Sequence, residues 1–270
     1  MTPADTGWHW PEWAAELTGM ALFMFAIVSA NYWAARAPVL GELGRATVIA
    51  AVAGAARFGI AISVLGRKSG AHLNPAVTFG FWVQRVAGSS DAVGYLCAQT
   101  AGGLVGVAAA RVWGMAVARP PVRWGLIHPS AGVSPTAAVA IEAGATFLQL
   151  VLVFGTLSSR WHRHAPAVAS LGLAVSILTL LSVTGAGFNP VRGLCPDIAA
   201  SAYPAIWIYL VAPMAGAAAA AGSARRLGRQ PLTGKLRHDS RIECHLACGL
   251  THRGAGRPPS EAPEPGHCSR

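Results

Sequence analysis

The chain has 270 residues, of which 53% are hydrophobic and 12% charged; its formal net charge is +10 at pH 7 and its mean hydropathy is +0.44. An ordinary soluble domain carries about twice this share of charged residues, so the composition excludes one and makes a membrane protein the first hypothesis.

Six stretches are long enough to cross a membrane, because each holds roughly 20 mainly apolar residues. They cover residues 13–35, 46–66, 92–114, 135–157, 165–184 and 203–224. Their many Ala and Gly residues predict close helix packing. Residues 1–12, which precede them, lack the basic start of a cleavable signal, and the tryptophans around them are typical of an interfacial belt.

Basic residues predict the orientation of these spans. Three loops on one side hold most of them: Arg67, Lys68 and Arg85; Arg160 and Arg163; and Arg225, Arg226 and Arg229. The positive-inside rule assigns this side to the cytoplasm. We therefore expect a multi-pass protein of the cell membrane with both termini cytoplasmic.

Two carboxylates lie inside apolar spans. Glu16 falls in the first span and Glu142 in the fourth, each at a comparable distance before an Asn-Pro motif. A buried carboxylate is costly unless it finds donors within the bundle, so both are interpreted as structural. The chain divides into halves at about 13–114 and 135–224, and three spans per half make the second half insert upside down.

The Asn-Pro motif occurs twice without a gap. Ser69-Gly70-Ala71-His72-Leu73-Asn74-Pro75-Ala76-Val77 returns as Thr184-Gly185-Ala186-Gly187-Phe188-Asn189-Pro190-Val191-Arg192. Asn is a strong N-cap and Pro suits the first helical turn, so each copy predicts a loop that ends in a helix start. The apolar segments that follow, 75–85 and 190–198, are too short to span and predict re-entrant half-helices around a pore.

These caps suggest a chemistry for the pore. An N-cap Asn accepts a backbone N–H through its side-chain oxygen, which leaves its NH₂ group to point away from the helix. Two such groups from opposite sides would meet at mid-pore and donate to a permeating oxygen. The half-helix N-termini, each carrying about half a positive charge, would repel protons and cations. One such motif alone would be an ordinary capped loop; the matched pair favours a pore.

The paired motifs, Pro196 and the two buried carboxylates resemble the aquaporin, or major intrinsic protein, family over residues 13–225. The resemblance implies an all-α membrane protein with six transmembrane helices and two half-helices in an inverted repeat. It implies pore motifs Asn74-Pro75-Ala76 and Asn189-Pro190-Val191, and a homotetramer with one pore in each subunit.

The resemblance also implies an outer constriction formed by Gly54, Ile177, Ala186 and Arg192, with Thr179 as the alternative to Ile177. This set lacks the aromatic residue and the His expected in water-selective members, which favours solutes such as glycerol or urea. Gly193 follows the Arg where glycerol facilitators often have Asp, so the evidence on the solute is divided.

Four further residues depart from the expected pattern or have open roles. Val191 replaces Ala and adds two methyl groups that can tilt the half-helix or narrow the pore; we expect the change to be tolerated without loss of function. Arg57 lies inside a span, where it snorkels, pairs with a carboxylate such as Glu142, lines the pore, or indicates that the span boundaries differ from those given. His72 packs the loop or contacts the solute, and Cys195 either fills space or borders the pore.

Residues 225–270 are rich in Arg, Pro, Gly, Ser and His and predict a disordered cytoplasmic tail. Its basic excess, next to a span, suits anionic lipid headgroups better than nucleic acid. The tail contains Cys244, His245, Cys248, His252, His267 and Cys268. We find no standard zinc spacing among them and predict no metal and no cofactor.

The sequence thus predicts a passive channel for water or small neutral solutes such as glycerol that excludes protons and ions. The alternative is a coupled secondary transporter, for which only Glu16, Glu142 and Arg57 are candidate coupling groups. No nucleophile with a matched base, metal site or phosphate loop indicates an enzyme.

Overall fold

The computed structural model describes residues 7–242 and 244–250. In this part of the chain the regular structure is helical, apart from one isolated antiparallel bridge between Thr233 and Cys248.

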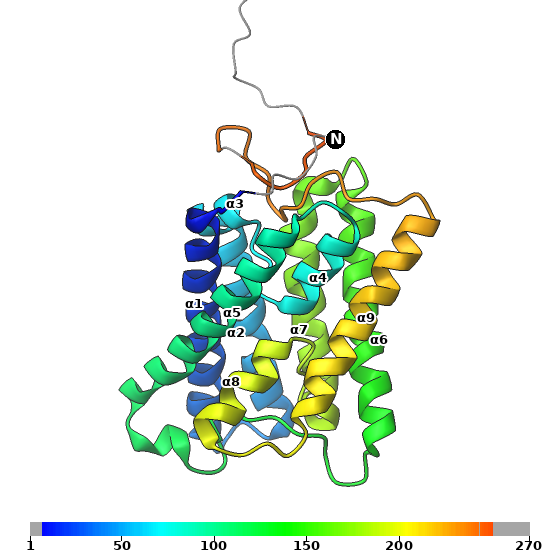
Figure 1. Ribbon diagram of the computed structural model, residues 1–270. Helices are drawn as coiled ribbons and strands as arrows, with labels where there is room; N and C mark the ends of the chain where they lie inside the picture. The colour runs from blue at the N-terminus through cyan, green and yellow to red at the C-terminus, as the bar shows by residue number, and fades with distance from the viewer. Residues whose placement is uncertain (1–6, 243, 251–270) are drawn as a thin grey trace, which may run out of the picture.

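Six of the described helices are long and apolar enough to cross a membrane, as predicted (Figure 1). They are α1 (Trp10–Ala35), α2 (Glu42–Ile62), α5 (Ser89–Ala109), α6 (Pro135–Leu157), α7 (Ala165–Thr184) and α9 (Ile206–Arg226). Their starts follow local rules: α6, for example, begins at Pro135 after Ser134, whose hydroxyl accepts the backbone N–H of Ala137 at 3.2 Å.

The second predicted span differs from the structure at its end. Ser63 adopts an extended backbone, with ψ at 177°, and its hydroxyl donates to the carbonyl of Ile60 at 2.7 Å. A Ser side chain that bonds the local backbone competes with the helix ladder, so α2 stops and a short helix, α3 (Val64–Ser69), follows in a new direction.

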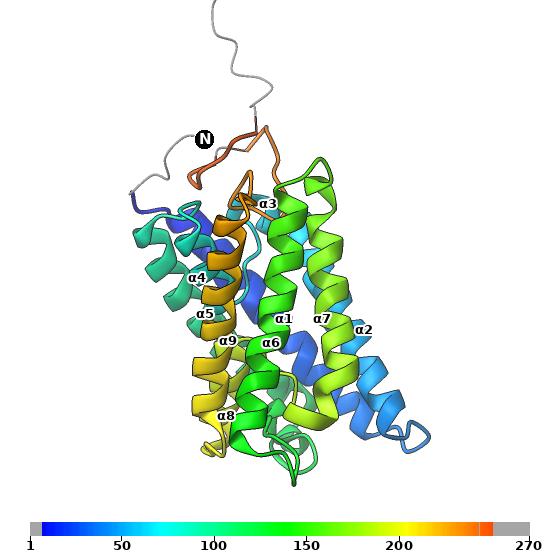
Figure 2. The same cartoon turned by 90° about the vertical axis from the view of Figure 1, so that its right-hand side faces the viewer.

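The two half-helices are α4 (Pro75–Val83) and α8 (Pro190–Ala200). Figures 1 and 2 show α4 in one half of the bundle and α8 in the other, so that their N-termini approach each other between the long helices. The predicted re-entrant segments therefore exist, and each reaches only part of the way through the molecule.

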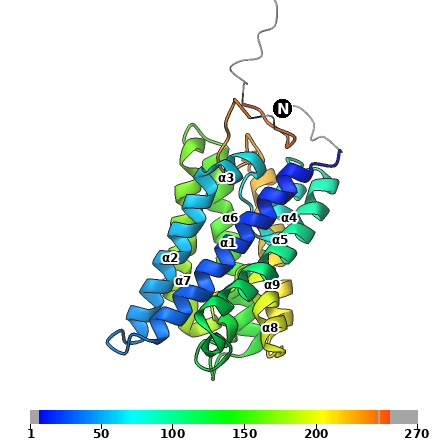
Figure 3. The ribbon, with the colours of Figure 1, turned by 90° about the vertical axis from the view of Figure 1, so that its left-hand side faces the viewer.

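The helix packing repeats between the halves. α1 packs on α5 as α6 packs on α9, while α4 contacts α9 and α8 contacts α5 (Figure 3). A Cβ atom on Gly102 of α5 would collide with the carbonyl oxygen of Leu17, and one on Gly216 of α9 with that of Ala143. Because Leu17 and Ala143 directly follow the two buried carboxylates, the same close backbone contact occurs once in each half.

Short 3-10 turns complete the described helices. Three of them, η1 (Ala110–Trp113), η2 (Met115–Ala118) and η3 (Arg123–Gly125), connect α5 to α6 at the end where α8 lies. The fourth, η4 (His162–His164), precedes α7.

The C-terminal segment differs from the expected disordered tail. α9 continues to Arg226, and residues 229–242 and 244–250 lie over the end of the bundle that carries α3 and the start of α1 (Figure 1). The apolar side chains of Leu236, Leu246 and Ala247 are buried there, and burial lowers the pKa of Lys235. A few apolar residues in a polar segment thus find a surface to cover. Residues 251–270 lie outside the described part.

Candidate pore

The two loops before the half-helices share an unusual backbone. Ala71 and Leu73 have φ values of 54° and 50°, and their counterparts Ala186 and Phe188 have 53° and 51°. Residues other than Gly rarely adopt this left-handed region, and such conformations persist only when the surroundings hold them. The repeat in sequence is therefore also a repeat in backbone conformation.

Glu16 holds the first loop. Its Oε1 accepts the hydroxyl of Ser69 at 2.7 Å and the N–H of His72 at 3.0 Å, while its Oε2 accepts the N–H of Leu73 at 2.8 Å. Gln99 of α5 also donates to Oε2, at 2.7 Å. The carboxylate thus satisfies the loop donors that the left-handed residues turn inward.

Glu142 does the same for the second loop. Its Oε1 accepts the hydroxyl of Thr184 at 2.6 Å and the N–H of Gly187 at 3.0 Å, and its Oε2 accepts the N–H of Phe188 at 2.6 Å. Both carboxylates are fully buried. They find the donors inside the bundle that the sequence analysis required of them.

Asn74 and Asn189 cap the two half-helices. The N–H of Ala76 donates to Asn74 Oδ1 at 2.8 Å, and that of Val191 donates to Asn189 Oδ1 at 3.0 Å. Each cap leaves the side-chain amide at the N-terminal end of its helix, where the partial positive charge of the helix dipole lies.

The two amides also bond across the molecule. Asn74 Nδ2 donates to the carbonyl of Phe188, and Asn189 Nδ2 donates to that of Leu73, both at 2.9 Å. Each Asn therefore bonds the residue that precedes the other Asn. An amide NH₂ has two donors, so this corrects the expectation of a wholly free group: one N–H is used between the halves and one remains.

A narrow cavity of about 30 Å³ runs past both asparagines. Arg192, Ala186, Arg57 and Val77 contribute to its wall. Much of the remaining lining is apolar: Phe23, Ile27, Ile49, Leu173, Ile177 and Leu181. The two motifs thus lie in the wall of a single cavity.

The structure places the residues predicted for the outer constriction in different surroundings. Ile177, Ala186 and Arg192 line the cavity, whereas Thr179 is exposed on the outside of α7. Gly54 differs from the expectation: a Cβ placed on it would lie 3.0 Å from Cβ of Ala174, so it serves the contact between α2 and α7. From α2 the cavity receives Ile49 and Arg57 instead. Sequence spacing misses this because it does not fix the rotation of α2.

Arg192 is buried at the cavity wall and is held from outside the helix. Its Nη1 donates to the carbonyl of Gly125, at the end of η3, at 2.6 Å. The connection between α5 and α6 therefore positions this cation. No motif in that connection points to such a role, so the sequence analysis missed it.

Arg57 is a second buried cation at the cavity. Its Nη1 donates to the carbonyl of His72 at 3.5 Å, and Glu142 bonds the second loop instead of this arginine. Gln149 of α6 lies in the same wall, and its Nε2 donates to Ser176 at 3.2 Å. Of the alternatives for Arg57, the structure agrees with the one in which its side chain lines the cavity. Gln149 was not predicted, because a single amide in a span forms no motif.

The other residues with open roles are packing residues. Val191 and Cys195 point toward Gly103 of α5, where a Cβ would collide with Val191 and lie 2.8 Å from the sulfur of Cys195. Both side chains are buried, so the extra methyl groups occupy space that a glycine provides. His72 stacks on Phe81 at 4.6 Å between ring centroids and packs its loop.

A second narrow cavity of about 20 Å³ shares Arg57, Asn74 and Gln149 with the first. At its far side it is lined by Leu236 of the C-terminal segment. Together the linings of the two cavities include Arg192, both asparagines and Leu236. Sequence analysis, which treated residues 225–270 as a tail, missed Leu236.

Known proteins resemble this chain over most of its length. The family model described as Major intrinsic protein matches residues 5–222. The glycerol uptake facilitator protein-like 6 of Lactiplantibacillus plantarum is 35% identical over 201 residues, which cover 70% of this chain and 92% of that protein. The lens fiber major intrinsic protein of Gallus gallus is 30% identical, over 95% of this chain and 91% of that one.

Among solved structures, the aquaglyceroporin from Plasmodium falciparum matches with a TM-score of 0.69 at 21% identity. The match covers 80% of this chain and 96% of that structure. At this identity the likeness concerns the fold, and it extends to the arrangement of the six long helices.

Proposed function

The chain belongs to the major intrinsic protein family of membrane channels, and we propose that it conducts water and small neutral solutes such as glycerol while excluding protons and ions. It is a multi-pass membrane protein and not an enzyme. We further propose that it lies in the cell membrane with both termini in the cytoplasm, as a homotetramer with one pore in each subunit.

The observation that carries this proposal is the crossed pair of asparagines. Each amide keeps one N–H after donating to the opposite loop at 2.9 Å, and both amides lie in the wall of one cavity. A hydroxyl or water oxygen that passes between them can accept from both. The bonds across the loops fix these donors in place, so a passing oxygen meets an organised site.

Positive charge supports the exclusion of cations and protons. The N-termini of α4 and α8 lie at the two asparagines, and each is equivalent to about half a positive elementary charge. Arg57 and Arg192 add two cations to the wall. A cation that has lost its water shell would meet this field without a carboxylate beside it, because Glu16 and Glu142 are bonded to the loops.

The chemistry of the wall favours a solute such as glycerol. One part is apolar, with Phe23, Ile49 and Ile177, and suits a carbon backbone. Arg57 and Gln149 add polar groups that suit hydroxyls. The glycerol uptake facilitator protein-like 6 of L. plantarum, at 35% identity, supports the same solute class by its name. Water would follow the same path.

Stopped-flow light scattering of vesicles that contain the purified protein tests this function. We expect both water and glycerol to equilibrate faster than in protein-free vesicles, and a pH-sensitive dye inside the vesicles to report no added proton leak. Vesicles with the protein that match protein-free ones for both solutes would contradict the proposal.

The same vesicles distinguish a channel from a coupled transporter. A channel gives a flux that rises in proportion to the solute gradient and does not change when a proton or sodium gradient is imposed. A flux that saturates, or that follows an ion gradient, would favour the transporter instead. Arg57 would then be the group to examine, since both carboxylates serve the loops.

A further inference from the structure

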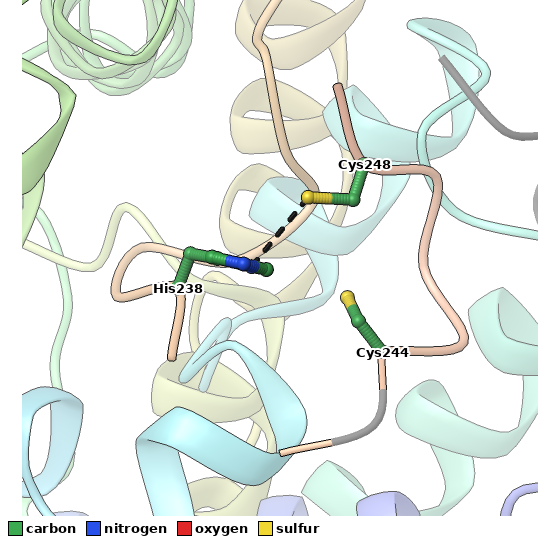
Figure 4. A group of neighbouring side chains, drawn as sticks. All are labelled: His238, Cys244 and Cys248. Carbon is green, nitrogen blue, oxygen red and sulfur yellow. Dashed lines mark hydrogen bonds between the residues drawn. The ribbon is translucent and has the colours of Figure 1, made fainter. Parts of the chain in front are cut away.

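Three side chains of the C-terminal segment converge over the end of the bundle that carries α3. The imidazole of His238 and the sulfur atoms of Cys244 and Cys248 all lie within 4.8 Å of one another. The sulfur of Cys248 is 3.5 Å from Nδ1 of His238 (Figure 4). Figure 4 shows Cys244 turned toward the same space.

Two thiols and one imidazole are ligands that zinc prefers. In a tetrahedral zinc site the ligand atoms lie about 2.0 to 2.3 Å from the metal, and so less than about 4 Å from each other. The observed distances approach this arrangement, and small side-chain rotations would complete it. Three residues separate Cys244 from Cys248, which lies within the two to four residues that separate paired cysteines in zinc sites. This corrects the sequence-based expectation that the segment has no standard zinc spacing.

We propose that His238, Cys244 and Cys248 bind a zinc ion, with water at the fourth position, and that the ion holds the C-terminal segment closed over the pore. The first part rests on the convergence of the three ligands. The second rests on the proposed channel function.

The segment that precedes the site is docked into the mouth of the pore. The N–H of Leu236 donates to the carbonyl of Gly70 at 3.1 Å, and Nε2 of His72 bonds the carbonyl of Gly234 at 2.8 Å. Lys235 Nζ donates to the carbonyl of Arg67 at 3.1 Å. Leu236 is 1% exposed and lines the cavity beside Asn74. Residues 234–236 thus form a plug at the mouth of the pore, and this plug ends two residues before His238.

The ligands come from both sides of one loop. His238 lies two residues after the end of the plug. Cys248 instead pairs with Thr233 in the antiparallel bridge, where the N–H of Gly249 donates to the carbonyl of Leu232 at 2.7 Å. A metal that joins His238 to the two cysteines closes this loop and removes the extended conformations in which Leu236 leaves the mouth. Because the ligands converge in the docked form, zinc stabilises that form.

Metal binding is tested first, on the purified full-length chain in a thiol-free reductant. We expect one Zn²⁺ per chain, and with Co²⁺ as a probe we expect the thiolate-to-cobalt charge-transfer absorption of a sulfur-ligated site. Substitution of Cys244→Ser, Cys248→Ser or His238→Ala should weaken binding by about tenfold or more. Cys97→Ser, which changes an exposed cysteine of α5, is the matched control and should change nothing.

Absence of thiolate-to-cobalt absorption in the unaltered chain, with its thiols titrated as free, would overturn the site without reference to any variant. Equal binding by Cys248→Ser and the unaltered chain would also overturn it.

The flux experiment then tests closure. In vesicles, Zn²⁺ should lower glycerol and water flux through the unaltered chain and through Cys97→Ser, and a chelator should restore it. Cys248→Ser should lose this response. A chain that binds cobalt through sulfur but shows the same flux with and without zinc would overturn closure. If neither Cys248→Ser nor the unaltered chain gives any water or glycerol flux, even in chelator, the proposed channel function fails while the metal site stands.

Discussion

Asn74 and Asn189 each carry out three tasks with one side-chain amide. The oxygen caps the half-helix, one N–H bonds the opposite loop, and the other N–H is the one that the proposed function assigns to a passing solute. Because each group bonds the residue before the other asparagine, the two loops and the two donors are fixed by the same bonds. The donor geometry of the site therefore depends on both halves at once.

Replacing Asn189 with Asp tests this arrangement. The substitution keeps the cap but removes both N–H donors and places a carboxylate oxygen against the carbonyl of Leu73. A lost hydrogen bond of about 1.4 kcal/mol corresponds to a roughly tenfold lower flux. We expect a fall of this order in glycerol flux, measured by stopped flow, and a greater cation leak.

Asn31→Asp is the matched control, because Asn31 also donates to a backbone carbonyl, that of Ile27 at 2.9 Å, at the far end of α1. It should leave the flux unchanged. Equal flux and equal cation leak in Asn189→Asp and the unaltered chain would remove Asn189 from the pore.

Helix packing explains how the second half tolerates its irregular motif. Val191 is larger than the Ala at the equivalent position of the first motif, and α5 provides Gly103 where the added methyl groups lie. The half-helix α8 is thereby seated against α5, as α4 is seated against α9. The departure in the motif and the glycine in a distant span form one packing unit.

Gly103→Ala should therefore destabilise the protein, and Val191→Ala should restore it in the double variant. Overpacking of this kind costs about 1 to 3 kcal/mol, so the thermal transition in detergent should fall in the single variant and recover in the double one. Gly155→Ala is the control, because a Cβ on Gly155 meets no atom within 4 Å. Additive effects of the two substitutions would show that the side chains do not meet.

The molecule as a whole is an inverted pair of halves with an asymmetric addition. The halves supply equal parts to the path: a loop, a buried carboxylate, a cap and a half-helix. The described part of the C-terminal segment covers one end of the bundle, where Leu236 lines the second cavity. Control of the pore by this segment would therefore act at one mouth and leave the asparagines untouched.

Truncating the Leu236 side chain of the plug should increase solute flux. Leu236→Ala removes most of the side chain that lines the second cavity, and we expect faster glycerol and water flux in vesicles that contain a chelator. Leu227→Ala alters an exposed leucine, 74% accessible, in the same part of the chain and should have no effect. Slower or unchanged flux in Leu236→Ala would mean that the docked segment does not limit transport.

The sequence by itself determined the six spans, the inverted repeat, the two half-helices and the family, because these follow from apolar length, from helix-start chemistry and from a motif that occurs twice in order. It also pointed to Glu16 and Glu142, since a carboxylate in an apolar span requires donors. Their positions one residue before the close helix contacts were not visible, because that contact depends on a glycine far along the chain.

Only the tertiary structure decided which side chains share the cavity. The rotation of α2 placed Arg57 and Ile49 in the wall and Gly54 against α7, and spacing along a helix does not fix its rotation in a bundle. The connection before α6 supplied the carbonyl that holds Arg192. The C-terminal segment, polar by composition, docked through a few apolar residues and backbone bonds and brought His238 to two cysteines. Contacts of this kind join residues far apart in the chain, so no local pattern records them.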